Sequence, residues 1–213
     1  MSRPGRLARG QSQPVRLVRG QSVVARRRTR AVELLVVVGA ALALRLLVAG
    51  AAGAASKPGA ALFAVVLLAA AIGAGWRPGR LQPTGLAWGL VGAVGLVAGP
   101  LVLRDTIAHP QLHLSAAGFP LWAVVVTGVA VAEEVLLRGV LFTAVEEAAG
   151  VAPALVATTV VFALIHVPLY GVGALPLDLA VGLWLGGLRI ASGGVMAPAT
   201  AHAVADLAEW WLW

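Results

Sequence analysis

Three charged side chains lie close together within an otherwise apolar stretch of the chain. Glu133 and Glu134 are adjacent, and Arg138 follows four residues after Glu134. On an α-helix Glu134 and Arg138 would share one face, whereas Glu133 would be rotated by about 100°. Arg138 can therefore neutralise one glutamate and leave the other free. A structural ion pair needs only one carboxylate, so the second one favours a role in chemistry.

An imidazole follows in the next apolar stretch, where His166 lies four residues after Phe162. Gly150 predicts a turn between the two stretches, because Pro153 suits the first turn of the next helix. Glu134 and His166 are each sixteen residues from Gly150. That separation corresponds to about 24 Å at 1.5 Å per helical residue. We therefore expect the glutamates and His166 to meet at one depth in the molecule.

A second histidine, His202, precedes Asp206 by one helical turn. Counted from the expected turn at Gly193 and Gly194, His202 would lie several residues closer to the membrane surface than His166. We therefore expect residues 193–198 to enter the membrane as irregular backbone, which is tolerated only where it lines a protein cavity. The helices that carry the histidines and carboxylates must bundle for these side chains to converge.

Carboxylates beside imidazoles favour the activation of a water molecule. A buried glutamate can act as a general base toward water, and a histidine can donate a hydrogen bond to the oxyanion that develops at an attacked carbonyl. The chain has no cysteine, no serine arranged with a base, no glycine-rich phosphate loop and no His-Glu-x-x-His zinc helix. The predicted reaction class is hydrolysis, with a peptide bond as the expected target.

The motifs, taken in order, resemble a known family. Glu-Glu-x-x-x-Arg (133–138), Phe-x-x-x-His (162–166) and His-x-x-x-Asp (202–206) follow one another, similar to the CPBP or Abi family of CAAX prenyl endopeptidases and bacteriocin-processing proteases. Residues 194–202 (Gly-x-Met-Ala-Pro-x-x-x-His) are also similar to the family's approach to its last motif. The resemblance covers about residues 119–213. It implies an intramembrane endopeptidase acting on membrane-associated proteins or peptides.

The resemblance also implies roles for the first two motifs. Glu133 would activate the hydrolytic water together with His166. Glu134 and Arg138 would support and orient the site, and Phe162 would belong to the same support.

The third motif departs from the family pattern at Asp206, where asparagine is frequent. By the resemblance, His202 and residue 206 would stabilise the oxyanion. An ionised carboxylate would repel that oxyanion. Asp206 is therefore expected to be protonated, to accept a hydrogen bond from His202, or to serve another role.

A divalent metal is an open question at this stage. The family is often described as metalloproteases, and Glu133, His166 and His202 together could ligate Zn²⁺. Water activated by a glutamate without any metal explains the same residues. The sequence leaves both mechanisms open.

The elements that position these residues are membrane-spanning helices by composition. Of 213 residues, 60% are hydrophobic and 12% charged, whereas a soluble domain is about half apolar and about a quarter charged. A bilayer crossing needs about 20 apolar residues. We therefore predict an all-α polytopic transmembrane helix bundle. Glycine, proline and charge divide it into seven spans, at about 31–53, 59–75, 84–103, 119–148, 151–168, 173–190 and 195–213.

The formal net charge of +7 is concentrated before the first span. Residues 1–30 hold nine arginines, no acidic residue and a short repeat, Arg-Leu-x-Arg-Gly-Gln-Ser, and we expect this tail to be disordered. Basic residues beside a span stay cytoplasmic, so we expect a cytoplasmic N-terminus. A single lysine in a chain rich in Ala, Gly, Val and Leu favours a bacterial plasma membrane. The expected partners are the lipid bilayer and a peptide or protein substrate, not a nucleic acid.

The chain is accordingly divided into a tail (1–30), N-terminal transmembrane helices (31–118) and a catalytic membrane core (119–213). Arg45 in the first span can snorkel or pair locally, and Glu33 lies at its cytoplasmic mouth. His109 and His113 are four residues apart in a connector, where a metal site is not favoured. The tryptophans at the end of the last span fit an aromatic belt on the outer side.

Two other function classes would use the same residues. A proton-coupled transporter would employ the buried glutamates and histidines as a relay and should show inverted repeats, which the sequence lacks. A non-catalytic membrane scaffold or immunity-type protein would tolerate substitution at every motif position. The endopeptidase is the favoured interpretation, with its substrate and oligomeric state unassigned.

Overall fold

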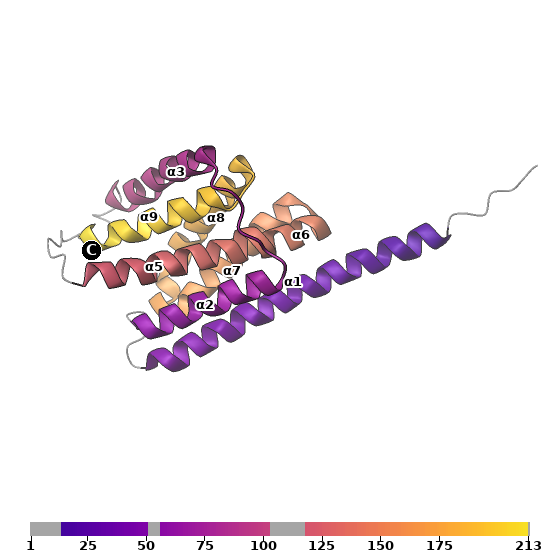
Figure 1. Ribbon diagram of the computed structural model, residues 1–213, viewed down its shortest axis with the longest axis horizontal. Helices are drawn as coiled ribbons and strands as arrows, with labels where there is room; N and C mark the ends of the chain where they lie inside the picture. Colours follow the sequence, from indigo (N-terminus) through magenta and orange to yellow (C-terminus); the bar gives the residue numbers. More distant parts are fainter. Residues whose placement is uncertain (1–13, 51–55, 103–117, 213) are drawn as a thin grey trace, which may run out of the picture.

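The chain folds as a bundle of helices. The computed structural model describes residues 14–50, 56–102 and 118–212, and these contain helices and no strands. The predicted all-α class is confirmed. Figure 1 shows the helices packed alongside one another. In chain order they are α1 (Pro14–Ala49), α2 (Lys57–Gly73), α3 (Pro83–Val102), α5 (Phe119–Glu134), the π-helical η2 (Val135–Leu141), α6 (Phe142–Ala149), α7 (Val151–Tyr170), the 3₁₀ turn η3 (Val172–Ala174), α8 (Leu175–Ser192) and α9 (Met196–Leu212).

Helix length and surface composition identify a membrane protein. Four helical stretches are long and apolar enough to cross a bilayer: Thr29–Ala49, Phe119–Ala149, Val151–Tyr170 and Val172–Ser192. α2 and most of α3 are shorter apolar helices. Large apolar side chains such as Leu47 and Val124 are more than 70% exposed. A surface of this kind suits lipid, because soluble proteins rarely expose large apolar patches.

Glycines end three of the helices and set the hairpins. Gly150, Gly171 and Gly193 have φ values of 95°, 82° and 70°, a region that residues with a Cβ atom rarely enter. Each directly follows the last residue of α6, α7 or α8. The spans predicted at 151–168 and 173–190 therefore agree with α7 and α8 within two residues.

The first helix begins earlier than expected. α1 starts at Pro14, so residues 14–30, which we expected to be disordered, continue the first span as helix. The reason is that this segment contains only one glycine and no internal proline, and extending a nucleated helix is easier than starting one. Residues 1–13 lie outside the described residues, as do His109 and His113 with their candidate metal site.

α9 packs against α3, α5 and α8, and glycines on α3 permit a close approach. A Cβ atom added at Gly89 would lie 2.5 Å from Cβ of Thr200, and one added at Gly92 would lie 2.5 Å from Cδ1 of Leu188. Small residues let helix backbones approach closely within a membrane. α3 thereby fixes the position of α9, which carries His202.

The helix that carries the two glutamates contains a π-helical segment. α5, η2 and α6 form one continuous run, Phe119–Ala149, and η2 begins directly after Glu134. Segments of this kind are rare and are frequently found at functional sites. The leucines of η2 are at most 1% exposed (Leu136, Leu137 and Leu141). η2 therefore forms part of the tightly packed core next to the glutamates.

The connection between α8 and α9 is shorter than expected. Only residues 193–195 lie outside the helices, and Met196–Pro198 form the first turn of α9. The prediction of irregular backbone over 193–198 is therefore wrong for residues 196–198. That prediction assumed that all hairpin turns lie at one depth in the membrane. In the structure the 31-residue run that ends with α6 extends past the start of the 17-residue α9 (Figure 1).

Candidate active site

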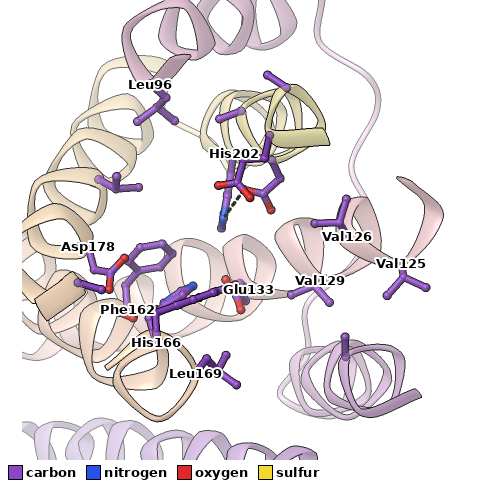
Figure 2. Close-up of a pocket in the computed structure, with 18 of the residues that line it drawn as sticks. Leu96, Val125, Val126, Val129, Glu133, Phe162, His166, Leu169, Asp178 and His202 are labelled. Carbon is purple, nitrogen blue, oxygen red and sulfur yellow. Dashed lines mark hydrogen bonds and ion pairs between the residues drawn. The ribbon is translucent and has the colours of Figure 1, made fainter. Parts of the chain in front are cut away.

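A cavity of about 760 Å³ lies between α5, α7, α8 and α9 and reaches α1, α2 and α3. Figure 2 shows side chains from several of these helices pointing into it. Of the five predicted catalytic residues, all except Glu134 line this cavity. Its titratable lining residues are Arg45, Lys57, Glu133, His166, Tyr170, Asp178, His202, Asp206 and Glu209.

Glu133 and Glu134 are adjacent but occupy different environments. Their exposed fractions are 2% and 0%, and Oε2 of each has no hydrogen-bond partner among the described residues. Oε1 of Glu134 accepts from Nη1 of Arg138 at 2.7 Å and lies 3.0 Å from Nδ1 of His202. Only Glu133 lines the cavity. One carboxylate is therefore held by the protein, whereas the other faces the space where a ligand would bind.

Arg138 is fully buried in η2 and joins three elements. Besides its ion pair with Glu134, its Nη2 donates to the carbonyl oxygen of Gly182 on α8 at 3.2 Å. Its own carbonyl oxygen accepts from Nε of Arg189 at 3.0 Å. A buried charge needs such partners, because an uncompensated charge in an apolar interior is strongly destabilising. The contacts of Arg138 thus fix η2 against α8.

His166 is oriented by its own helix. Its Nδ1 lies 2.7 Å from the carbonyl oxygen of Phe162, one turn earlier. A carbonyl oxygen can only accept, so Nδ1 carries the proton and Nε2 of the neutral ring keeps its lone pair. The imidazole also stacks on Tyr170, with 5.8 Å between ring centroids. Because His166 lines the cavity, Nε2 is the nitrogen available to a ligand or water.

His202 lies between two carboxylates. Its Nδ1 faces Glu134, and its Nε2 lies 3.5 Å from Oδ1 of Asp206. The second distance exceeds the range of about 2.7–3.2 Å for ordinary N–H···O bonds. The Nε2 position of His202 is therefore loosely held and can be used by a bound group.

Phe162 contacts three of the polar side chains. Its ring centroid lies 4.5 Å from that of His166, 5.5 Å from that of His202 and 4.7 Å from Cζ of Arg138. The ring is 2% exposed. Phe162 thus packs against Arg138 and both histidines and holds all three in position.

Comparison with protein-family models matches residues 115–208 to the model described as Type II CAAX prenyl endopeptidase Rce1-like. Residues 115–208 are similar to this family model, and we call them the Rce1-like region. The family resemblance predicted from the motifs is confirmed, and the Rce1-like region contains all three motifs. It begins just before α5 and leaves out α1–α3. Searches among curated proteins and among solved structures found no match.

The donor atoms of the Rce1-like region do not fit the candidate zinc site. Among the residues that the structure describes, no group of three or more His, Asp or Glu side chains could hold a metal ion. Glu133 and His166 offer donor atoms at the cavity, whereas both nitrogens of His202 face carboxylates. Protein zinc sites use at least three protein ligands. Glu133, His166 and His202 do not form such a set in this arrangement.

Asp178 of the Rce1-like region lines the cavity but is absent from the predicted site. It lies near Phe162 (Figure 2), and its Oδ2 is buried without a hydrogen-bond partner among the described residues. A signal for it exists, because an ionisable residue inside a span is a functional candidate by default. Arg45, assigned a local structural role from the sequence, is instead buried at the cavity, 5.2 Å from the ring of Phe63.

Proposed function

We propose that the protein is an intramembrane endopeptidase that hydrolyses peptide bonds of membrane-associated proteins or peptides. The Rce1-like match supports endopeptidase activity at family level. One observation carries the proposal. Of two adjacent buried glutamates, Glu134 is bound by Arg138 and His202, whereas Glu133 faces the cavity together with His166.

In this mechanism Glu133 is the general base. It takes a proton from a water molecule as the water oxygen attacks the carbonyl carbon of the scissile bond. Nε2 of neutral His166 accepts the second hydrogen bond of the same water and holds it in position. The C–N bond then breaks, and the proton on Glu133 passes to the leaving nitrogen. The products are a carboxylic acid and an amine, and transfer of the acid's proton to the amine gives a carboxylate and an ammonium group.

The oxyanion formed during the attack needs a hydrogen-bond donor. His202 supplies it through the N–H at Nε2, whose 3.5 Å separation from Asp206 leaves it free to turn toward a ligand. Glu134 fixes the ring from the other side at Nδ1, and Arg138 fixes Glu134. Asp206 faces Nε2 of His202 at 3.5 Å when no oxyanion is present.

We place the protein in a bacterial plasma membrane with its N-terminus in the cytoplasm. Nine arginines precede the first span, and Arg77 and Arg80 lie in the connector between α2 and α3. Arg30 of α1 donates to the carbonyl oxygen of Ala74, which joins the two basic segments at one end of the bundle. Basic segments beside spans are retained on the cytoplasmic side.

The substitution Glu133→Gln tests the proposal because it removes the base and keeps the side-chain shape. Mass spectrometry of protein termini should show that termini present in cells with the wild-type protein fall by about 100-fold or more, in the range for loss of a general base. Glu33→Gln, which changes an exposed glutamate on α1, is the matched control and should leave the termini unchanged. Undiminished cleavage by Glu133→Gln at equal protein level would refute the mechanism.

A further inference from the structure

The helices that line the cavity do so from the same half of the bundle. α1, α3, α7 and α9 end in this half, and their lining residues belong to their later turns, such as Arg45 in α1 and His166 in α7. α2, α5 and α8 start in this half. Lys57 and Asp178 lie in the first turns of α2 and α8, and Glu133 lies in the first half of the continuous run Phe119–Ala149 that begins with α5. Figure 1 shows the starts of α2 and α5 and the end of α9 at one end of the molecule, opposite α6. We call this the cavity half.

Among the described residues, the exposed fraction of the lining side chains is larger at the rim of the cavity than at its floor. At its rim, Tyr170 is 59% and Leu177 42% exposed, whereas Glu133 and His202 at its floor are 2% and 6% exposed. Beyond the floor, the leucines of η2 and Phe142 at the start of α6 are at most 1% exposed. A peptide therefore approaches Glu133 through the rim and not through the opposite half.

The arginines gather at the opposite end. α1 starts at that end, and its first half carries six of the nine arginines of residues 1–30, from Arg16 to Arg30. Arg77 and Arg80 lie in the connector that follows α2 at the same end. At the cavity end α2 starts with Lys57, and the sequence between α3 and α5 holds one arginine, Arg104. The bias of basic residues toward one side sets membrane orientation, so the arginine end is the cytoplasmic end. The cavity half then lies toward the other side.

Aromatic side chains mark the level of the rim. Phe119 and Trp122 at the start of α5 pack against Trp210 at the end of α9 with ring centroids 5.8 Å and 5.0 Å away, and Phe119 also contacts Trp211. Trp122 lines the cavity. Tryptophan is enriched at the membrane–water interface, so the rim lies near a membrane surface.

We propose that the cavity opens at the non-cytoplasmic surface of the membrane and receives polypeptide segments presented on that side, close to where they leave the bilayer. The sidedness follows from the cavity half and the arginine distribution alone. The substrate class rests on the proposed endopeptidase function. The two parts therefore need separate measurements.

The chain contains no cysteine, so single-cysteine variants report position without background. Val172→Cys changes a residue that is 71% exposed in the turn between α7 and α8, at the cavity end. Leu177→Cys changes a rim residue that is 42% exposed. Leu81→Cys changes a residue that is 79% exposed in the connector at the arginine end. Intact bacterial cells are treated with a membrane-impermeant maleimide, before and after permeabilisation. Val172→Cys and Leu177→Cys should react in intact cells, and Leu81→Cys only after permeabilisation.

The reverse pattern, with Leu81→Cys reactive in intact cells, would overturn the sidedness. Reaction of Val172→Cys without Leu177→Cys would overturn access through the rim. Neither result depends on catalysis, so the labelling is interpretable even if the endopeptidase proposal fails. For the substrate class, the cleavage sites that Glu133→Gln abolishes should lie in non-cytoplasmic segments, and sites confined to cytoplasmic segments would refute it.

Discussion

The N-terminal helices α1–α3 and the C-terminal helices α5–α9 bury charge in different ways. Among the described residues of α1–α3, Arg45 is the one buried charged side chain, and it forms no ion pair there. The C-terminal helices bury Glu133, Glu134, Arg138 and His202 together, and three of these form one ion-paired group. The Rce1-like match covers only this second region. On the proposed function, the C-terminal region supplies the chemistry and the N-terminal region supplies mainly shape.

The largest expected effect comes from comparing two buried arginines, one in each region. Arg138→Met leaves Glu134 buried without its main ionic partner, and breaking a buried pair in this way costs about 3–5 kcal/mol. Arg45→Met removes a buried charge that has no ion pair in the described chain, so we expect little loss of stability. The measurement is the thermal midpoint of each purified variant in detergent. Equal losses for the two variants would break the contrast between the regions.

A smaller effect is expected where the N-terminal region shapes the site from outside. Gly89→Ala places a Cβ atom 2.5 Å from Cβ of Thr200 and 2.9 Å from the carbonyl oxygen of Ala197. α3 must then move away from α9, at about 1–3 kcal/mol for overpacking, and His202 should shift with α9. Cleavage should fall several-fold.

Gly99→Ala is the control for this test, because a Cβ atom at Gly99 would meet nothing within 4 Å. It lies on the same helix and makes the same chemical change. If Gly89→Ala and Gly99→Ala cleave equally well, α3 does not position the catalytic helix, and the role given to the N-terminal region is wrong.

The smallest effect is expected from metal removal. The charged group of the C-terminal region is held by its own ion pairs, and Glu133 and His166 can activate water without a third ligand. A chelator should therefore leave cleavage unchanged, and elemental analysis of the purified protein should find no stoichiometric transition metal. Loss of activity on chelation with recovery on adding Zn²⁺ would show that the site rearranges to bind metal.

The sequence predicts those features that depend on the residues at the ends of helices. Gly150 predicts the hairpin between α6 and α7, and equal separation from it predicts a common depth for the glutamates and His166. Glu133 and His166 do line one cavity. These predictions succeed because helical rise is constant and glycine at positive φ is a local requirement.

Features that depend on contacts between distant helices were not predictable in the same way. The apolar residues of η2 would suit an ordinary α-helix equally well, and the contact of Arg138 with Gly182 that accompanies the π-helical segment joins residues 44 positions apart. The place of Asp178 at the cavity depends on how α8 starts after η3, which composition does not reveal.

The π-helical segment has a consequence for how this protein can vary between relatives. A π-helix closes its hydrogen bonds over five residues and an α-helix over four, so η2 changes the rotational phase between α5 and α6. Deleting a single residue within Val135–Leu141 would leave the apolar character of the span intact. It would remove the extra residue that the wider turn holds, so the segment could close into an ordinary α-helix with α6 kept in phase with α5. A single-residue deletion among relatives should therefore fall within Val135–Leu141 and not in α5 or α6, where it would turn the rest of the helix by about 100°.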